Sequence, residues 1–300
     1  MIKFRIITDS SCGISQEEAK NIGVVVLPLT LTLNGKDYKD GIDISTDDFY
    51  NLLFSDENKD FPKTSMVAPL AFKEEMEKAI NNGEIPLILP ISSVLSGTYQ
   101  SAVIAKDMLE NDDVIVIDSQ TALGSVKIMI LDLVSKQFES KEELINYVEY
   151  LKKHVNFYAV PDTLEYLYRG GRLSKTTAVI GNLLKLKPVI QLNSTGKLEQ
   201  IATSRGLKHA FLKIVDEIKE EPIDFDHPLE FGYSNHEENV LLLKDYLKDI
   251  VPNETKLCQI SPVVGAHVGP GASAFFYISK NEVKKEKESI LAKIKRKINS

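Results

Sequence analysis

The first half of the chain alternates short apolar, β-branched runs with segments of helical periodicity, and no other feature restricts the possible folds as strongly. Four runs have the composition of strands, and they are FRIIT, VVVLPL, PLILPI and VIVID. The segments LAFKEEMEKAI and TYQSAVIAKDMLE, and a long amphipathic stretch over about 121–151, have the pattern of helices. Strands that alternate with helices predict an α/β fold, with a parallel sheet and helices on both of its faces.

The second half of the chain has a different order of predicted strands and helices. Two strands flank Ser194-Thr195-Gly196, and a helix is predicted over about 207–220. The later strands PLEFGYS, KLCQISP and AFFYIS are separated by a helix and a glycine-rich turn, and a lysine-rich helix ends the chain. Hairpins with intervening helices predict an α+β domain. We therefore expect an α/β domain over 1–160 and an α+β domain over 161–300, with a hairpin around Asn34-Gly35 projecting from the first.

Composition argues against several classes of protein. A net charge of −7 opposes nucleic-acid binding, which needs a basic surface. No apolar stretch reaches the length of a membrane span, so stable membrane insertion is not expected. Cys12 and Cys258 form no CxxC pair, which favours a reducing, cytoplasmic location. The histidines lack metal-ligand spacing and no P-loop is present, so neither a metal nor another cofactor is expected.

Arginine is rare in this chain, yet three of its five arginines fall close together. Arg169, Arg172 and Arg205 lie within 37 residues. Because the planar guanidinium group suits carboxylates and phosphates, the cluster indicates an anion site or a surface for an acidic partner. Ordinary solvated charge explains any one of them equally well.

Polar side chains follow three of the predicted parallel strands. The three clusters are Asp9-Ser10-Ser11, Ser92 to Thr98, and Asp118 to Thr121. The carboxyl ends of parallel strands share one edge, where open sheets bind ligands. Each cluster also precedes a predicted helix, so helix capping explains any one of them, but three at one edge favour a polar site.

Two hydroxyl-bearing segments are the best placed for an anion. In the turn Ser96-Gly97-Thr98, glycine lets a ligand approach the backbone, and the following helix offers unpaired N–H groups. Thr64-Ser65 provides a second hydroxyl pair, just ahead of a helix predicted to begin near Pro69.

Ser96 also has a catalytic interpretation, as the nucleophile of a serine acyl hydrolase with His267 as its base. The G-x-S-x-G elbow is absent around Ser96, and nothing in the spacing favours a triad through Asp9 or Asp118. His267 lies between Gly265 and Gly269, in what is predicted to be a turn between two strands. A binding role and a simple turn role are equally compatible with that position.

Five segments together resemble the signature of a known family. ITDSSCGIS, PISSVLSGTYQSA, LEYLYRGGRLS, LKLKPVIQLNSTGKL and GAHVGPGASAFFY occur in the order found in the DegV family of bacterial fatty-acid-binding proteins. The resemblance covers nearly the whole chain. It implies an N-terminal α/β domain and a C-terminal α+β domain, with a long-chain fatty acid buried between them. It also implies a lipid-binding protein without catalytic machinery of its own.

The resemblance further implies roles for individual residues. The fatty acid carboxylate is held by the T-S segment at Thr64 and Ser65, by the S-G-T turn at Ser96 and Gly97, and by His267. The bound acid is presented to a separate ATP-dependent fatty acid kinase, which makes an acyl phosphate for phospholipid synthesis, and Arg205 resembles the arginine that contacts this partner. One loop departs from the family pattern, because T-S-Q-P-S is here T-S-M-V-A.

The two ends of a fatty acid make different demands on a binding site. Burying one methylene contributes roughly 0.8 kcal/mol, so a tail of about fourteen methylenes offers on the order of 11 kcal/mol before association costs. An anion at a helix N-terminus contributes only about 0.3 to 2 kcal/mol. The tail therefore supplies affinity, and the hydroxyls orient the head group. A lipid-sensing regulatory protein with some other partner remains a further alternative.

Overall fold

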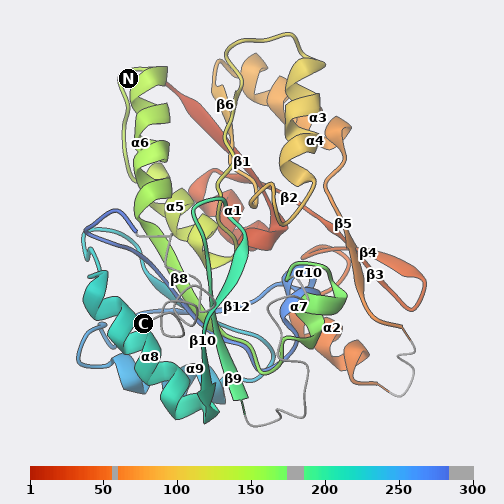
Figure 1. Ribbon diagram of the computed structural model, residues 1–300. Coiled ribbons are helices and arrows are strands. Elements are labelled where there is room, and N and C mark those ends of the chain that lie inside the picture. The colour runs from red at the N-terminus through yellow and green to blue at the C-terminus, as the bar shows by residue number, and fades with distance from the viewer. Residues whose placement is uncertain (56–59, 174–185, 284–300) are drawn as a thin grey trace, which may run out of the picture.

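The computed structural model describes residues 1–55, 60–173 and 186–283 and arranges them in three sheets with helices packed around them (Figure 1). A four-stranded sheet occupies the upper part of the molecule in Figure 1, and a six-stranded sheet the lower part. This confirms the predicted combination of a parallel-sheet α/β region with a C-terminal α+β region. No helix among the described residues is long and apolar enough to cross a membrane. The predicted lysine-rich terminal helix lies outside the described residues.

The four-stranded sheet is parallel throughout. Its strands, in spatial order, are β2 (Val25–Leu27), β1 (Phe4–Asp9), β6 (Ile85–Ile88) and β7 (Ile115–Val116). Because successive side chains of a strand point to opposite faces, Ile6 and Ile7 of β1 join different core clusters. The helices that cover the two faces are α1 (Gln16–Ile22) and α5 (Gly124–Val134) on the side of Ile6, and α3 (Pro69–Asn81) and α4 (Thr98–Asp107) on the side of Ile7.

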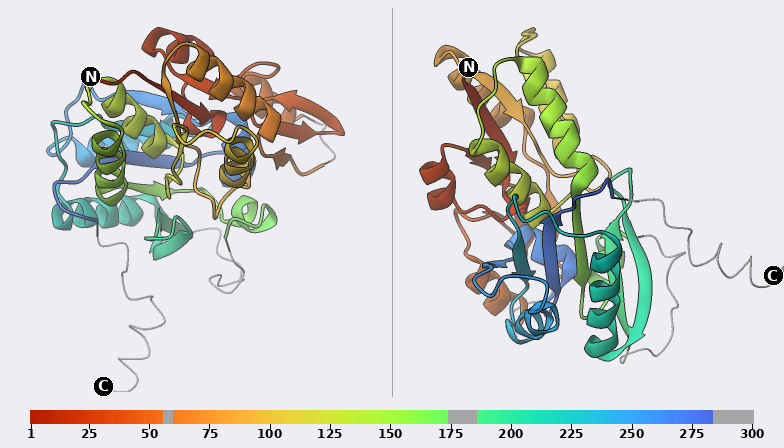
Figure 2. Two further views of the ribbon diagram at one scale, coloured as in Figure 1. Left: turned by 90° about the horizontal axis from the view of Figure 1, so that it is seen from above. Right: turned by 90° about the vertical axis from the view of Figure 1, so that its left-hand side faces the viewer.

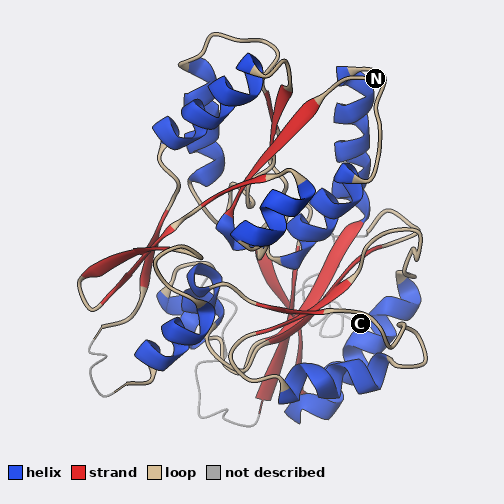
Figure 3. Cartoon of the chain, turned by 180° about the vertical axis from the view of Figure 1, so that it is seen from behind, coloured by secondary structure: helices blue, strands red, loops and turns tan. Residues whose placement is uncertain are grey.

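The six-stranded sheet is antiparallel except for one pair at its edge. Its strands, in spatial order, are β10 (Leu198–Arg205), β9 (Leu186–Leu192), β8 (Val155–Val160), β13 (Ser273–Ile278), β11 (Glu230–Tyr233) and β12 (Leu257–Gln259). One face packs through Tyr158 and Phe275 on α8 (Gly206–Glu220) and α9 (Glu238–Leu247). The other face packs through Phe157 and Phe276 on α5. Viewed from behind, Figure 3 shows helices between the two sheets.

The strand β8 links the two halves of the chain. It comprises the last residues of the range 1–160, yet it pairs with β9 and β13 in the six-stranded sheet. All six of its residues are buried, because helices cover both faces of the sheet at this point. The division of the chain at residue 160 stays a prediction.

A small antiparallel sheet projects from the side of the molecule (Figures 1 and 2). Its strands, in spatial order, are β4 (Lys36–Lys39), β3 (Thr30–Leu33) and β5 (Lys63–Ser65). Asn34 and Gly35 connect β3 to β4 with φ angles of 53° and 72°. Two consecutive positive φ angles are what a type I′ hairpin turn requires, so the predicted hairpin is confirmed. The pairing of β5 with β3 was not predicted.

The amphipathic stretch 121–151, for which a helical pattern was noted, forms two helices. The first is α5, and the second is α6 (Lys141–His154). Ser140 begins α6 by accepting a hydrogen bond from the Glu143 amide. The Ser-x-x-Glu spacing is a capping signal that predicts this break.

The predicted glycine-rich turn around His267 is wrong, because this segment is a helix, α10 (Pro262–Val268). Proline at its first position suits a helix start, and Val263 to Val268 continue it. Gly265 is needed for packing, since a Cβ there would lie 2.6 Å from the hydroxyl oxygen of Tyr50 in α2 (Thr46–Leu53). Gly269 ends the helix with a φ of 73°. The short helix α7 (Glu165–Arg169) packs against α10.

Candidate functional site

An apolar cavity of about 70 Å³ lies where the polar edge of the four-stranded sheet meets the six-stranded sheet and α10. It has several times the roughly 10–15 Å³ that one water molecule needs. Its walls come from both halves of the chain and include Leu95, Leu123, Phe157, Ile190 and Val263. Among the described residues, five polar side chains also line it: Ser11, Thr64, Ser96, Arg172 and His267. An apolar chamber with a few polar groups is the usual form of a small-molecule site.

Strand pairing decides which hydroxyl of the T-S segment reaches the cavity. Thr64 is paired with Leu31 and Ser65 with Thr30, so the two side chains point to opposite faces of the small sheet. Thr64 lines the cavity, and its Oγ1 shares a hydrogen bond of 2.8 Å with Nε2 of His267. Ser65 is exposed and is not among the lining residues.

His267 is held in a neutral form. Burial, together with the nearby positive charge of Arg172, lowers the pKa of its imidazole to about 4. Its Nδ1 is buried and has no hydrogen-bond partner among the described residues. This side of the ring lies against Gly170, where the space is too small for a side chain. A neutral imidazole has one N–H donor and one acceptor nitrogen, so Nε2 can either donate to the Thr64 hydroxyl or accept from it.

Ser96 lies at the entrance to α4. Its Oγ shares a hydrogen bond of 2.9 Å with Oγ1 of Thr98 and accepts one from the Thr98 amide at 3.3 Å. Gly97 is exposed, and a Cβ on it would lie 2.7 Å from Sδ of Met66. Met66 stands in the loop that departs from the family pattern, so this departure places a thioether directly over the turn.

Arg172 is a lining residue that the sequence marked only as part of an arginine cluster. Its Nε donates to the carbonyl of Leu95 at 3.0 Å, and its Nη1 donates to the carbonyl of Gly170. It is partly buried, and burial lowers the pKa of its guanidinium group. No carboxylate of the described residues forms an ion pair with it. A partly desolvated cation of this kind favours a bound anion.

The two aspartates that follow the parallel strands are engaged in local structure. Asp9 accepts hydrogen bonds from the amide and hydroxyl of Ser11 and from the Ile91 amide. Asp118 accepts from the amide and hydroxyl of Ser93 and from the Gln120 amide. The simpler interpretation of these clusters therefore holds for their carboxylates, which cap a helix and stabilise the adjoining loops.

The geometry does not assemble a serine hydrolase. His267 is bonded to Thr64 and Ser96 to Thr98, and no hydrogen bond joins Ser96 to His267. Over the described part of the chain no carboxylate binds the free nitrogen of His267, and no group of three or more potential ligands could hold a metal ion. Arg205 is exposed at the end of β10, away from the cavity lining.

Comparison with known families identifies the architecture. The family model described as "Uncharacterised protein, DegV family" matches residues 3–280. The chain belongs to the DegV family. A DegV domain-containing protein of Caldanaerobacter subterraneus is 35% identical over 284 residues, covering 93% of this chain and all of that protein. One of Staphylococcus aureus is 32% identical over 289 residues, again covering 93% of this chain and all of the relative.

Solved structures of the DegV family have the same fold. A DegV family protein from Thermus thermophilus, described by its fatty acid binding, has a TM-score of 0.83 and 30% identity, covering 93% of this chain and all of that chain. DegV of Bacillus subtilis, described as a fatty acid binding protein, has a TM-score of 0.80 and 26% identity over the same shares.

Proposed function

We propose that this protein binds a long-chain fatty acid in the apolar cavity, with the carboxylate at its polar end and the tail along the apolar walls. The observation that carries the proposal is the composition of the cavity lining: among the described residues, three hydroxyls, a neutral imidazole and a guanidinium without a carboxylate partner face an otherwise apolar chamber. A fatty acid matches this division, because it has one anionic group and a long tail whose burial drives binding. The names of the structural relatives support the same ligand class.

The carboxylate is assigned to Thr64, Ser96, His267 and Arg172. Thr64 and Ser96 donate hydroxyl hydrogen bonds to it. Ser65 and Gly97 are the exceptions among the residues implied by the resemblance, because the Ser65 side chain points to solvent and Gly97 does not line the cavity.

Lipid extraction and native mass spectrometry of the purified protein test the binding proposal. We expect one long-chain acid per chain, and delipidated protein should take up palmitate or oleate. Protein that is empty as purified and refuses both acids would contradict the proposal.

Thr64→Ala and Ser96→Ala should each weaken fatty acid binding roughly tenfold or more, because a hydrogen bond to a charged group contributes about 1.5 to 3 kcal/mol. Titration with a fluorescent long-chain acid measures the change. Ser65→Ala is the matched control, and its affinity should equal that of the wild type. Unchanged affinity in both Thr64→Ala and Ser96→Ala would reject this head-group site.

We further propose that the bound acid is a substrate presented to an ATP-dependent fatty acid kinase in the cytoplasm, so that the chain itself needs no catalytic group. In that reaction a carboxylate oxygen attacks the γ-phosphorus of ATP, the bond to the β-phosphate oxygen breaks, and acyl phosphate and ADP result. Arg205, exposed at the start of α8, is assigned to the contact with the kinase.

Arg205→Glu should leave fatty acid binding intact and lower acyl phosphate formation at least tenfold, because charge reversal at a docking surface opposes association. Production of ADP with a bacterial fatty acid kinase and ATP measures turnover. Lys219→Glu, exposed at the other end of α8, is the control and should retain turnover. Normal turnover of Arg205→Glu would reject the docking role.

A further inference from the structure

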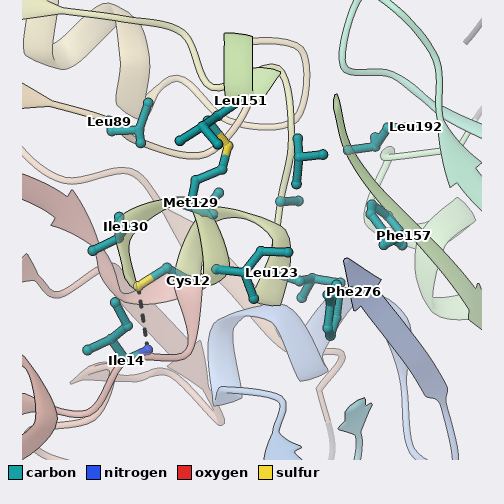
Figure 4. Close-up of a cluster of buried hydrophobic side chains, with 14 of the residues drawn as sticks. Cys12, Ile14, Leu89, Leu123, Met129, Ile130, Leu151, Phe157, Leu192 and Phe276 are labelled. Carbon is teal, nitrogen blue, oxygen red and sulfur yellow. Dashed lines mark hydrogen bonds between the residues drawn. The ribbon is translucent and has the colours of Figure 1, made fainter. Parts of the chain in front are cut away.

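A second, smaller void of about 10 Å³ adjoins the main cavity. Of the residues that the structure describes, three line both spaces and therefore form the partition between them: Ser11, Leu123 and Ile260. The far wall of the small void includes Cys12, Gly124, Gly232, Cys258 and Phe276. Figure 4 shows Leu123 between Cys12 and Phe276.

Among the partition residues, Leu123 has an unusual backbone conformation. Its φ is 59° and its ψ is −145°, directly before the first residue of α5. A leucine rarely adopts a positive φ, and such residues persist only where the surrounding structure holds them. Its side chain is only 8% exposed, and this backbone directs it into the space between the two voids.

The wall behind the partition is closely packed. A Cβ on either Gly124 or Gly232 would collide with the Phe276 ring, so the ring is packed directly on the backbone of α5 and β11. Phe276 also packs against Phe157, a wall of the main cavity, with ring centroids 5.8 Å apart. The far side of the small void is therefore formed by closely packed groups, and the partition separates this void from the main cavity.

We propose that Leu123 determines acyl-chain specificity by closing the deep part of the cavity and excluding the terminal methylenes of longer acids from the second void. The proposal rests on fatty acid binding in the main cavity. Removing the side chain joins the two spaces, and each additional methylene that the joined space buries favours the longer acid about fourfold.

The test compares acids retained by delipidated protein from an equimolar mixture of saturated C12 to C20 acids, measured by mass spectrometry after extraction. Leu123→Ala should raise the ratio of C18 to C14 acid about fourfold or more over the wild type. Leu123→Gly should do the same, and it keeps the proposal testable if the alanine variant folds poorly, because glycine accepts the positive φ without strain.

Leu144→Ala is the control for a general loss of core packing. Leu144 is fully buried in the same hydrophobic cluster but lines neither void, so its variant should keep the wild-type ratio. An unchanged ratio in both Leu123 variants, with acid still bound, would overturn the specificity role and leave fatty acid binding intact. A wild-type protein that retains no acid from the mixture would instead contradict the binding proposal itself.

Discussion

Relative to the wild type, the Asp40→Asn variant is expected to become more stable as the pH rises. The difference between the two free energies of unfolding should change by about 3 kcal/mol in favour of the variant between pH 5 and pH 8. Asp40 is completely buried, and desolvation raises the pKa of its carboxyl group to about 7. The hydroxyls of Ser10 and Ser261 and the amide of Val263 offset part of this cost, and the negative charge of Asp9 adds to it. The carboxyl oxygens nevertheless make no hydrogen bond of normal length to the described residues.

The sign follows from the protons bound in each state. Between about pH 4 and pH 7 the folded protein keeps the Asp40 proton and the unfolded chain has lost it, so the free energy of unfolding falls by about 1.4 kcal/mol per pH unit. Above pH 7 both states are ionised and this contribution is constant. Asparagine has nearly the same shape and does not titrate, so the free energy of unfolding of the variant does not fall in this way.

Denaturant unfolding at pH 5 and pH 8 measures the difference. Asp112→Asn is the control, because Asp112 is exposed, and its difference from the wild type should be the same at both pH values. If the stability of Asp40→Asn relative to the wild type were no greater at pH 8 than at pH 5, Asp40 would not be buried in its protonated form.

Gly170→Ala should lower fatty acid affinity at least tenfold while leaving the fold intact. The φ of Gly170 is −73°, which alanine adopts readily, so the conformation of Gly170 itself is not the obstacle. The added methyl group would overlap Nδ1 of His267 and lie 3.0 Å from its Cε1. The imidazole must then move, and its hydrogen bond to Thr64 is lost with it.

Two comparisons isolate this mechanism. Gly171→Ala is the neighbouring control: its φ of 73° strains any side chain, but no atom lies within 4 Å of the new methyl group, so it should affect stability more than affinity. In the background of His267→Ala, Gly170→Ala should have little further effect, because the atom it displaces is gone. A full additional loss of affinity in the double variant would show that Gly170 acts by another route.

Much of the fold follows from local sequence patterns. The alternation of β-branched runs with helical segments predicted the four-stranded parallel sheet, and Asn34-Gly35 predicted the hairpin of the small antiparallel sheet, because backbone conformation there depends on neighbouring residues alone. The errors arose where tertiary packing overrides local preference. Gly265 looked like a turn residue, but it permits α10 to pack on Tyr50.

The residue types of the candidate site could be predicted from the sequence, but its geometry could not. Thr64, Ser96 and His267 were marked by sequence and line one cavity. Ser65 was marked equally, but pairing between β5 and β3 turns it to solvent. Arg172 follows two glycines, which let the chain turn back, and this position could have marked it as a site residue. Its separation in sequence from the other site residues, however, gave no indication that they lie close together in space.

By itself, the sequence determined the order of the elements, the family and the hydroxyl-bearing segments, since these depend on short-range patterns and ordered motifs. Only the tertiary structure decided that segments more than 200 residues apart in the chain, at Thr64 and His267, share a hydrogen bond, and that Leu123 separates two voids. The physical reason is that the register of a strand and the packing of a helix on distant side chains are fixed by the whole core. No single segment carries that information.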